Sequence, residues 1–411
     1  MRIAYFLDEF PPFFRGGLGT YALEVAPRLA AAGHALSVYA WLSEGTVAEE
    51  VRGAITVRRP AIPDPRPLLP ILLPQEVAGW PPDSQRFFAE YQFYTILSAG
   101  DLLERGAGHD LAVAHDWLAA PAGMLAAASL GIPFVLHVHS TEAGRSVGEG
   151  SPTIRALEAR AAERADIVVT VSRAMQDELV SLGVPPEKIR VVYNGVDPVK
   201  YDPGRVLKAD VRAFRERLGL GDDPVILFVG RLTRVKGADT LVRAFQYVLQ
   251  DVPDARLVVI GVGETEDEVR HLAEMKGGGR VHLLFSVLPE EERIIAYAAA
   301  DLCVFPSTYE PFGIVCTEAM AMAKPVVVGA QGTSGMREQV VPSGPGICGF
   351  HIDPYDPRDI ATYITMILRD ATLRETMGRN GRARVLAMFT WEGAVEATLA
   401  AYEEACKRRG G

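Results

Sequence analysis

Short apolar runs alternate with amphipathic stretches along almost the whole chain, and this alternation limits the fold more than any other feature. An apolar run of four to six residues is typical of a strand buried on both faces of a parallel sheet. The runs of the first half are Arg2–Leu7, Ala35–Ala40, Leu111–Ala114, Phe134–Val138, Ile167–Val171 and Ile189–Val192. Those of the second half are Val225–Val229, Arg256–Ile260, Val281–Leu284, Leu302–Phe305 and Pro325–Val328. We therefore expect an α/β fold with helices on both faces of parallel sheets.

A stretch marked by proline and glycine, Asn194–Gly204, separates the two sets of runs, and we place the domain linker there. A chain of 411 residues exceeds one ordinary domain. We expect an N-terminal domain at 1–200 and a C-terminal domain at 201–389, both Rossmann-like, doubly wound and facing a central cleft. A last amphipathic segment, about 390–408, is expected to pack back on the first domain. Ligands of such sheets bind at the carboxyl ends of strands, so chemistry is sought in those loops.

The chain is acidic, because 42 lysines and arginines stand against 52 aspartates and glutamates, for a net charge of −10. A field of this sign repels polyanions and argues against nucleic acid as a partner, although a local basic pocket for one phosphate group is compatible with it. The cysteines show no paired spacing of the kind that binds metals. We interpret them as reduced thiols of a cytoplasmic protein: Cys303, Cys316, Cys348 and Cys406.

No transmembrane or targeting segment is expected. The N-terminal apolar run is broken by Asp8 and Glu9, and nowhere do about 18 apolar residues follow one another. Residues 60–82 are rich in proline and leucine, and their prolines are taken to exclude a regular helix or a central strand. We interpret this segment as an apolar loop, with a lid, a peripheral membrane contact or an acceptor-binding surface as alternatives.

Glycines at residues 16, 17 and 19 follow the first predicted strand and open a helix. Small residues let backbone N–H groups approach an anion, and the N-terminus of a helix favours negative charge. The turn is not the full G-x-G-x-x-G fingerprint of dinucleotide-binding proteins. Contact with a ligand and simple packing therefore remain equal alternatives.

Two cations, Arg231 and Lys236, stand five residues apart where the strand Val225–Val229 gives way to a helix. A guanidinium offers a bidentate fork to phosphate oxygens and an ammonium offers a point charge. In an acidic protein this pair is a sensible clamp for a diphosphate. A solvated surface pair is the alternative.

Two glutamates, Glu310 and Glu318, flank a Pro-Phe-Gly turn just after the strand Leu302–Phe305. Carboxylates accept hydrogen bonds from hydroxyl groups, so one of them could bind a sugar and the other a ribose. Glutamates eight residues apart are also common on solvated helices. Their position after a strand is what favours a binding site.

Three histidines, His115, His137 and His139, fall near the ends of predicted strands. A three-histidine metal site is conceivable, but no other motif supports it, and no D-x-D pair of the kind that holds a metal-bound sugar nucleotide occurs. We expect no metal. Imidazoles that form hydrogen bonds to a polar ligand fit the sequence better.

Taken together, these motifs resemble the retaining glycosyltransferases of family 4, which have the two-domain GT-B fold. The resemblance covers nearly the whole chain and rests on GGLGTYALEVAPRLAAAGH, HDW, the histidine of VHS, TVS, NGVD, GRLTRVKG, EPFGIVCTEA and the closing FTW. It implies transfer of a sugar from a nucleoside-diphosphate sugar, with retention of the anomeric configuration and without a metal. The segments HDWL, HSTEAGR and GTSGMREQV look most like bacterial and archaeal α-glucan synthases of the glycogen-synthase type.

The resemblance also implies roles for individual residues. Arg231 and Lys236 would hold the donor diphosphate, which Gly17 and Leu18 would approach from the other domain. Glu318 would bind the ribose hydroxyls. The catalytic set would be Arg231 and Lys236 together with two residues at the sugar, His139 and Glu310. The remaining sugar contacts would come from the backbone of Phe312 and Gly313 and from the side chains of Asp116 and Asn194.

Two positions depart from the family pattern. The larger glycogen synthases carry a lysine two residues before the paired glycines, where this chain has Phe14, and the adjacent Arg15 is a candidate substitute. Ser286 stands where many members have glycine, in the loop near the nucleotide base. The first departure weakens an assignment to glucan synthesis.

The sequence thus favours a metal-independent hexosyltransferase that needs no cofactor and uses ADP-glucose or UDP-glucose to extend an α-1,4-glucan. A family 4 transferase with a small or lipid acceptor, bound through residues 60–82, is one alternative. An epimerase of sugar nucleotides on the same fold is another. The nucleotide base of the donor is not predicted, because such folds read the base largely through their backbone.

Overall fold

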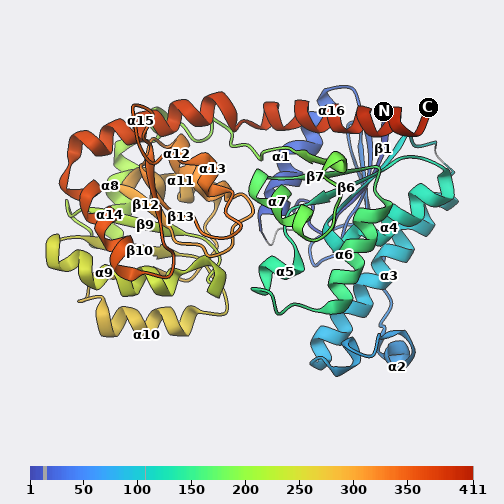
Figure 1. The fold of residues 1–411 in the computed structure, drawn as a ribbon, viewed down its shortest axis with the longest axis horizontal. Coiled ribbons are helices and arrows are strands. Elements are labelled where there is room, and N and C mark those ends of the chain that lie inside the picture. The colour runs from blue at the N-terminus through green and yellow to red at the C-terminus, as the bar shows by residue number, and fades with distance from the viewer. Residues whose placement is uncertain (13–15, 107, 411) are drawn as a thin grey trace. The chain divides into compact units, whose positions relative to one another are not determined.

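The computed structural model describes residues 1–12, 16–106 and 108–410, which form two compact α/β units (Figure 1). The N-terminal unit comprises Met1–Tyr193 and the C-terminal segment Trp391–Gly411, and the C-terminal unit comprises Asn194–Thr390. Each unit is built around one sheet, so the expected α/β class is confirmed. Among the described residues, no helix is long and apolar enough to span a membrane.

The sheet of the N-terminal unit has the strand order β3-β4-β2-β1-β5-β6-β7-β8. Its pairs are parallel except for the antiparallel hairpin of β3 and β4 at one edge. The strand order reverses between β1 and β5, and doubly wound sheets bind ligands at such a switch point. The strands are β1 (Arg2–Phe6), β2 (Ala35–Tyr39), β3 (Glu49–Arg52), β4 (Ile55–Arg58), β5 (Leu111–His115), β6 (Phe134–Val138), β7 (Ile167–Thr170) and β8 (Ile189–Val191).

Helices connect these strands, and the last helix of the chain returns to the same unit, where it packs against α1, β6 and β7. The α-helices are α1 (Gly17–Ala31), α2 (Leu69–Leu72), α3 (Pro82–Glu104), α4 (Asp116–Leu130), α5 (Glu142–Arg145), α6 (Pro152–Arg164), α7 (Arg173–Ser181) and α16 (Trp391–Gly410). Short 3₁₀ turns are η1 (Arg66–Leu68), η2 (Val77–Gly79) and η3 (Pro186–Lys188).

The sheet of the C-terminal unit is parallel throughout, with the order β11-β10-β9-β12-β13-β14. Its order reverses between β9 and β12. The strands are β9 (Val225–Val229), β10 (Arg256–Ile260), β11 (Val281–Leu284), β12 (Leu302–Phe305), β13 (Val326–Gly329) and β14 (Gly349–Ile352). Every residue of β9, β12 and β13 is buried, which explains their unbroken apolar sequences.

One apolar core joins this sheet to α9 and α14, and it includes Phe228, Leu241, Phe245 and Ile364. The helices of the unit are α8 (Lys208–Arg217), α9 (Ala238–Asp251), α10 (Glu266–Lys276), α11 (Glu290–Ala299), α12 (Ile314–Ala321), α13 (Met336–Gln339), α14 (Pro357–Arg369) and α15 (Ala371–Met388). Two 3₁₀ turns complete it, η4 (Pro203–Arg205) and η5 (Arg234–Lys236).

Residues 60–82 correct one expectation, because they contain the helix α2 and two 3₁₀ turns. Pro70 lies in the first turn of α2, where the N–H that proline lacks would have no partner within the helix. The segment is also anchored: Val77 is fully buried against Phe88 and Trp117. Its exposed part is the α2 turn, where the exposed fraction of Ile71 reaches 80%.

Candidate active site

The loop after β9 presents the two predicted cations at the switch point of the C-terminal unit. Arg231 is exposed, and no carboxylate among the described residues pairs with it. Lys236 is half-buried at the end of η5, and its ammonium lies 2.5 Å from the carboxylate of Glu310. The structure therefore brings Lys236 and Glu310 together from the loops that follow β9 and β12.

Close backbone contacts hold these two loops against each other. Gly237 has a φ of +70°, and a Cβ atom on it would lie 2.3 Å from the carbonyl oxygen of Pro306. The N–H of Thr308 donates to the carbonyl of Val235 at 2.9 Å. Glycine is thus required at residue 237, and the contact it permits sets the distance between Lys236 and Glu310.

Glu318 lies on α12 and is 3% exposed, and its two carboxylate oxygens accept four hydrogen bonds. Tyr201 donates to Oε1 and Tyr297 to Oε2, each at 2.8 Å, and Arg293 donates to both oxygens at 3.1–3.2 Å. Sequence reasoning missed these three partners, which come from distant parts of the chain. A ribose hydroxyl that bound to Glu318 would have to share or displace one of them.

The Pro-Phe-Gly turn after β12 starts α12. Gly313 has a φ of +90°, and a Cβ atom there would lie 2.4 Å from the Met336 side chain, so only glycine fits. Phe312 is buried, and its carbonyl accepts a hydrogen bond from Gln339 at 2.8 Å. Asn194, near the start of this unit, is 6% exposed, and its Oδ1 has no hydrogen-bond partner among the described residues.

In the N-terminal unit, Gly17 and Leu18 form the first turn of α1, directly after the β1 loop. Glu9 reaches this turn, and its Oε2 accepts hydrogen bonds from the N–H groups of Gly16 and Gly19 at 3.0 and 3.1 Å. These N–H groups suit an anion, and the protein supplies one from its own chain. Sequence reasoning missed this role of Glu9. Phe14, which stands where the larger glycogen synthases carry a lysine, and the adjacent Arg15 lie outside the described residues.

The three histidines gather at the carboxyl ends of β5 and β6. His115 and His137 occupy one register position on these neighbouring strands, and His139 follows two residues later. Asp116 fixes the backbone there, because its Oδ1 accepts from the N–H of His139 at 2.7 Å and from that of Ser140 at 3.4 Å. Asp116 itself has a φ of +53°, an uncommon conformation for a residue other than glycine.

Burial keeps these imidazoles neutral. The pKa values of His115 and His137 lie well below the ordinary value, first because of burial and second because a neighbouring imidazole would repel added charge. Burial also lowers the pKa of His139, against an opposing effect of Asp116 and Glu9. The switch point of the N-terminal unit therefore offers neutral hydrogen-bonding groups to a ligand.

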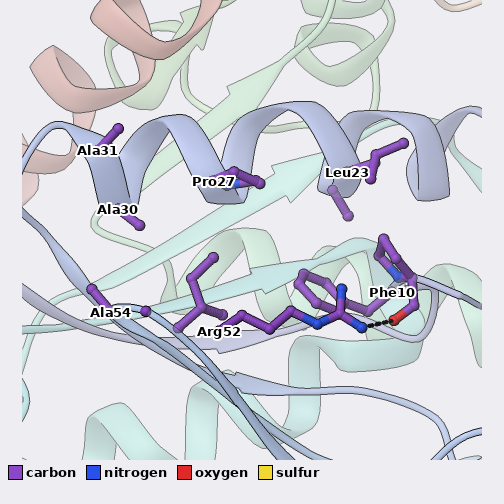
Figure 2. A pocket seen from close by; sticks show the side chains of 11 residues that line it. Phe10, Leu23, Pro27, Ala30, Ala31, Arg52 and Ala54 are labelled. Carbon is purple, nitrogen blue, oxygen red and sulfur yellow. Dashed lines mark hydrogen bonds between the residues drawn. The ribbon is translucent and has the colours of Figure 1, made fainter.

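The structure has an apolar hollow of about 350 Å³ between α1 and the β3–β4 hairpin. Figure 2 shows Leu23 and Pro27 above it and Arg52 below, with the Arg52 guanidinium 5.8 Å from the centroid of the Phe10 ring. None of the predicted site residues lines this hollow. A second, more open hollow of about 660 Å³ is lined by Trp80, Phe87, Asp83, Glu149 and neighbouring residues, with no lysine or arginine among them.

The two switch points can therefore do different chemistry. The C-terminal unit places an exposed arginine, a lysine and a carboxylate at the ends of β9 and β12, a set that can bind a phosphorylated ligand and accept from its hydroxyls. The N-terminal unit places neutral imidazoles and a helix N-terminus at the ends of β1, β5 and β6. Ser286, the other departure, lies exposed just after β11.

Two family descriptions match the chain in succession. Residues 15–200 match "Glycosyltransferase Family 4", and residues 210–384 match "Glycosyl transferases group 1". The matches span the β1 glycine turn and the histidines in the first case, and the cations and glutamates in the second. The chain is also 30% identical over the full length of both proteins to an uncharacterized glycosyltransferase of Methanocaldococcus jannaschii.

Other relatives have names that state an activity. A D-inositol 3-phosphate glycosyltransferase of Catenulispora acidiphila is 32% identical, over 95% of this chain and 91% of that protein. A glycogen synthase of Mycobacterium tuberculosis is 28% identical, over 98% and 94%. Among solved structures, a sucrose-phosphate synthase of Thermosynechococcus elongatus superposes with a TM-score of 0.82 at 25% identity, over 99% of both chains.

These similarities cover both units, and the predicted site residues lie within the matched ranges. The structural superposition agrees with the two-unit fold described above. The chain belongs to the family 4 glycosyltransferases and has their GT-B fold.

Proposed function

We propose that this glycosyltransferase moves a hexose, most simply glucose, from a nucleoside-diphosphate sugar to a growing α-1,4-glucan, with retention and without a metal. The observation that carries the proposal is the Arg231, Lys236 and Glu310 group at the switch point of the C-terminal unit. Its two cations suit a diphosphate in a chain of net charge −10, and its carboxylate suits sugar hydroxyls. No bound cofactor is needed, because the donor carries the activated bond.

In the proposed reaction, the bond between the anomeric carbon and the diphosphate oxygen breaks while the acceptor hydroxyl approaches from the same face. Arg231 and Lys236 stabilise the charge that grows on the leaving diphosphate. That diphosphate takes the proton of the acceptor hydroxyl as the new glycosidic bond forms. Glu310, the buried backbone of Phe312 and Gly313, and His139 would hold the sugar, with Asp116 and Asn194 at its pocket.

The remaining donor contacts in this proposal are Gly17 and Leu18 for the phosphates and Glu318 for the ribose. Gly17 and Leu18 lie at a helix N-terminus, where an incoming phosphate would replace the Glu9 carboxylate as the bound anion. A ribose hydroxyl would bind Glu318 by sharing or displacing one of the four hydrogen bonds that this carboxylate accepts. The Oδ1 of Asn194, which accepts no hydrogen bond from the described residues, would accept one from a sugar hydroxyl.

The hollow beside Trp80 favours a neutral glycan as acceptor. Its aromatic side chains offer faces to sugar rings, and Asp83 and Glu149 offer acceptors to hydroxyls. Its lining has no cation for the phosphate of a phosphorylated acceptor. The similarity to a glycogen synthase over 98% of the chain agrees with this choice.

A small or lipid-linked acceptor is the second candidate. Relatives named for inositol phosphate and sucrose phosphate support the small acceptor, and the exposed α2 turn with Ile71 supports a peripheral membrane contact.

The four cysteines are free thiols, and we accordingly place the protein in the cytoplasm.

A donor and acceptor screen tests the proposal. Release of nucleoside diphosphate would be measured with ADP-glucose, UDP-glucose and GDP-glucose, each with glycogen, malto-oligosaccharides, inositol phosphate, a hexose phosphate and lipid vesicles. We expect glucan-dependent release and an α-linked product by NMR. Release that depends only on a phosphorylated acceptor or on vesicles would replace the glucan assignment. Sugar-nucleotide conversion without any acceptor would indicate an epimerase.

A further inference from the structure

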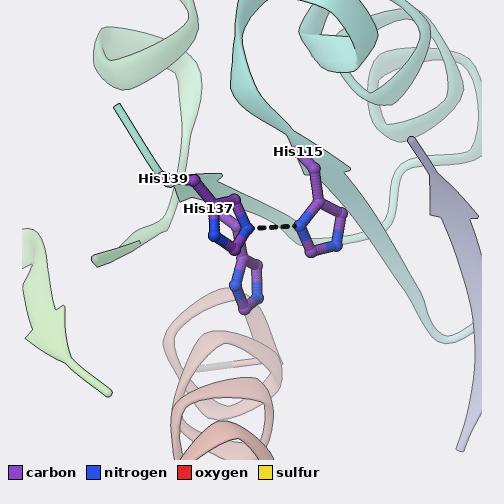
Figure 3. A group of neighbouring side chains, drawn as sticks. All are labelled: His115, His137 and His139. Atoms are coloured by element: carbon purple, nitrogen blue, oxygen red, sulfur yellow. Dashed lines mark hydrogen bonds between the residues drawn. The ribbon is translucent and has the colours of Figure 1, made fainter. Parts of the chain in front are cut away.

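His115 and His139 form a direct hydrogen bond between their rings. The Nδ1 atom of His115 lies 3.0 Å from the Nε2 atom of His139, and Figure 3 shows the two nitrogens pointing toward each other. The rings are nearly parallel, with centroids 5.3 Å apart and an interplanar angle of 22°. One ring nitrogen must donate and the other accept, so the pair has a definite arrangement of protons.

The burial of His115 decides which nitrogen donates. His115 is fully buried, and its Nε2 has no hydrogen-bond partner among the described residues. If His139 donated, the single proton of neutral His115 would sit on this Nε2, as a buried N–H without an acceptor. Buried orphan N–H groups are rarer in proteins than acceptors that lack a donor. The cheaper arrangement puts the proton of His115 on Nδ1 and makes His115 the donor.

We propose that His115 is a positioning residue that fixes the tautomer of His139. It donates its Nδ1–H to Nε2 of His139, so the proton of neutral His139 must lie on Nδ1. His139 is half-buried and can then offer Nδ1–H, in a fixed direction, to a sugar hydroxyl oxygen. This inference rests on the proposed function only in taking the sugar as the ligand of His139.

Adjacent residues would thus orient His139 in two complementary ways. Asp116 accepts from the backbone N–H of His139 at 2.7 Å, while His115 binds its ring at 3.0 Å. The His-Asp pair lies where β5 ends and α4 begins. A side chain held at both backbone and ring loses little freedom when the substrate binds.

His137 supports the same arrangement from beneath. Its ring stacks on that of His115 with centroids 4.6 Å apart, and its Nε2 lies 3.0 Å from the hydroxyl of Tyr402 on α16. Tyr21 contacts the ring from α1, with its hydroxyl 3.5 Å from Nδ1 of His137. The C-terminal helix therefore braces the ring that packs against His115.

A metal ion is the competing explanation for three clustered imidazoles. One nitrogen from each ring lies within 4.8 Å of the others, whereas nitrogens that share a tetrahedral zinc ion lie about 3.3 Å apart, given bond lengths near 2.0–2.1 Å. The rings are also stacked, with interplanar angles of 18–29°. Lone pairs in parallel ring planes do not converge on one point, so the geometry favours the hydrogen-bonded arrangement.

Nitrogen NMR of the full-length protein labelled at histidine tests the tautomer directly. We expect His139 to carry its proton on Nδ1 at neutral pH, with its signals assigned by their loss in His139→Ala. His115→Phe keeps an aromatic ring and removes the donor, and it should lower kcat/KM by roughly 10-fold, as expected for the loss of one hydrogen bond. The affinity for free nucleoside diphosphate should not change.

His115→Asn supplies a rescue, because its amide N–H₂ can occupy the position of Nδ1 and should restore most of the lost kcat/KM. His271→Phe, at an exposed histidine on α10, is the matched control and should behave as the parent protein does. Melting temperatures of all variants would be compared, and the NMR measurement on the parent protein does not depend on whether a variant folds.

A proton on Nε2 of His139, or full activity of His115→Phe, would overturn the inference. So would stoichiometric zinc binding by the parent protein that is lost in His137→Phe. If His139→Ala keeps full transferase activity while the tautomer is as expected, the role of His139 in the proposed function fails instead. The two failures are thus distinguishable.

Discussion

The two switch points of this glycosyltransferase differ in charge. In the N-terminal unit, His115 and His137 are buried, His139 is half-buried, and burial lowers the pKa of all three. In the C-terminal unit, Lys236 and Glu310 form an ion pair, and Arg231 is exposed with no carboxylate partner in the described part of the chain. The same Rossmann-like architecture therefore presents neutral donors in one half and charge in the other. The first set of groups suits uncharged hydroxyls, and the second suits a phosphate.

The largest effect on stability is expected at the Glu318–Arg293 ion pair of the C-terminal unit, because Glu318 is buried and supplies a carboxylate to a partly buried arginine. Glu318→Ala would leave Arg293 partly buried without its carboxylate and should lower the free energy of unfolding by about 3–5 kcal/mol. Urea unfolding measures this. Glu264→Ala, at an exposed glutamate, is the control and should change little. Equal stability of both variants would mean that the pair contributes nothing to this unit.

In the N-terminal unit, by contrast, a negative charge on the buried Asp8 should lower the stability of the fold. Burial, and next the nearby Glu9, raise the pKa of Asp8 to about 7, against an ordinary value of 3.8. The folded protein therefore holds this proton where the unfolded chain has lost it, so the contribution of Asp8 to stability falls as pH rises from about 4 to 7. At about 1.4 kcal/mol per pKa unit, the loss is on the order of 4 kcal/mol at most.

Asp8→Asn tests this, because asparagine stays neutral and keeps an oxygen that can accept the Tyr91 hydroxyl. We expect the variant to match the parent protein at pH 4 and to melt at a higher temperature at pH 8. A gain that is the same at both pH values would contradict the assignment to Asp8.

The proposed diphosphate clamp gives the next largest expected effect. Arg231→Ala and Lys236→Ala should each lower kcat/KM by roughly 100-fold or more, which is about 2.7 kcal/mol of transition-state stabilisation. Arg231→Ala should keep the parent melting temperature, because Arg231 is exposed and forms no ion pair with residues 1–12, 16–106 or 108–410. Near-normal turnover in both variants would mean that the charges at the C-terminal switch point do not contribute to transfer.

The smallest expected effect is that of a chelator. Under the proposed mechanism, the two cations neutralise the leaving diphosphate, so EDTA should leave the rate of transfer unchanged. Activity that disappears with EDTA and returns with Mn²⁺ would show that side-chain charge alone does not suffice.

Candidate residues could be chosen from the sequence because strands buried on both faces leave a clear apolar signal, and ligands of such sheets bind in the loops that follow the strands. Arg231, Lys236 and Glu310 were chosen in this way, and the structure places Lys236 and Glu310 in contact. The hairpin β3–β4, the short strand β14 and the helix α3 were missed. The strands β3, β4 and β14 lack the continuous apolar runs by which the other strands were recognised, and α3 begins at the end of the proline-rich residues 60–82 that we interpreted as a loop.

The partners of the site residues were not predictable, because they lie far apart in the sequence. Tyr201 and Arg293 reach Glu318 from other elements, and Tyr402 reaches His137 across 265 positions of the chain. Glu9 is close to the glycine turn in sequence, but an acidic residue beside a strand end carries no pattern that marks it as a cap.

The sequence by itself determined the α/β alternation, the two sets of strands and the loops where chemistry could lie, since these follow from local periodicity and from glycine, proline and charge at strand ends. Only the tertiary structure decided that the three histidines are kept neutral by burial and that Lys236 pairs with Glu310. Burial and pairing both depend on neighbours that the fold brings together from distant parts of the chain.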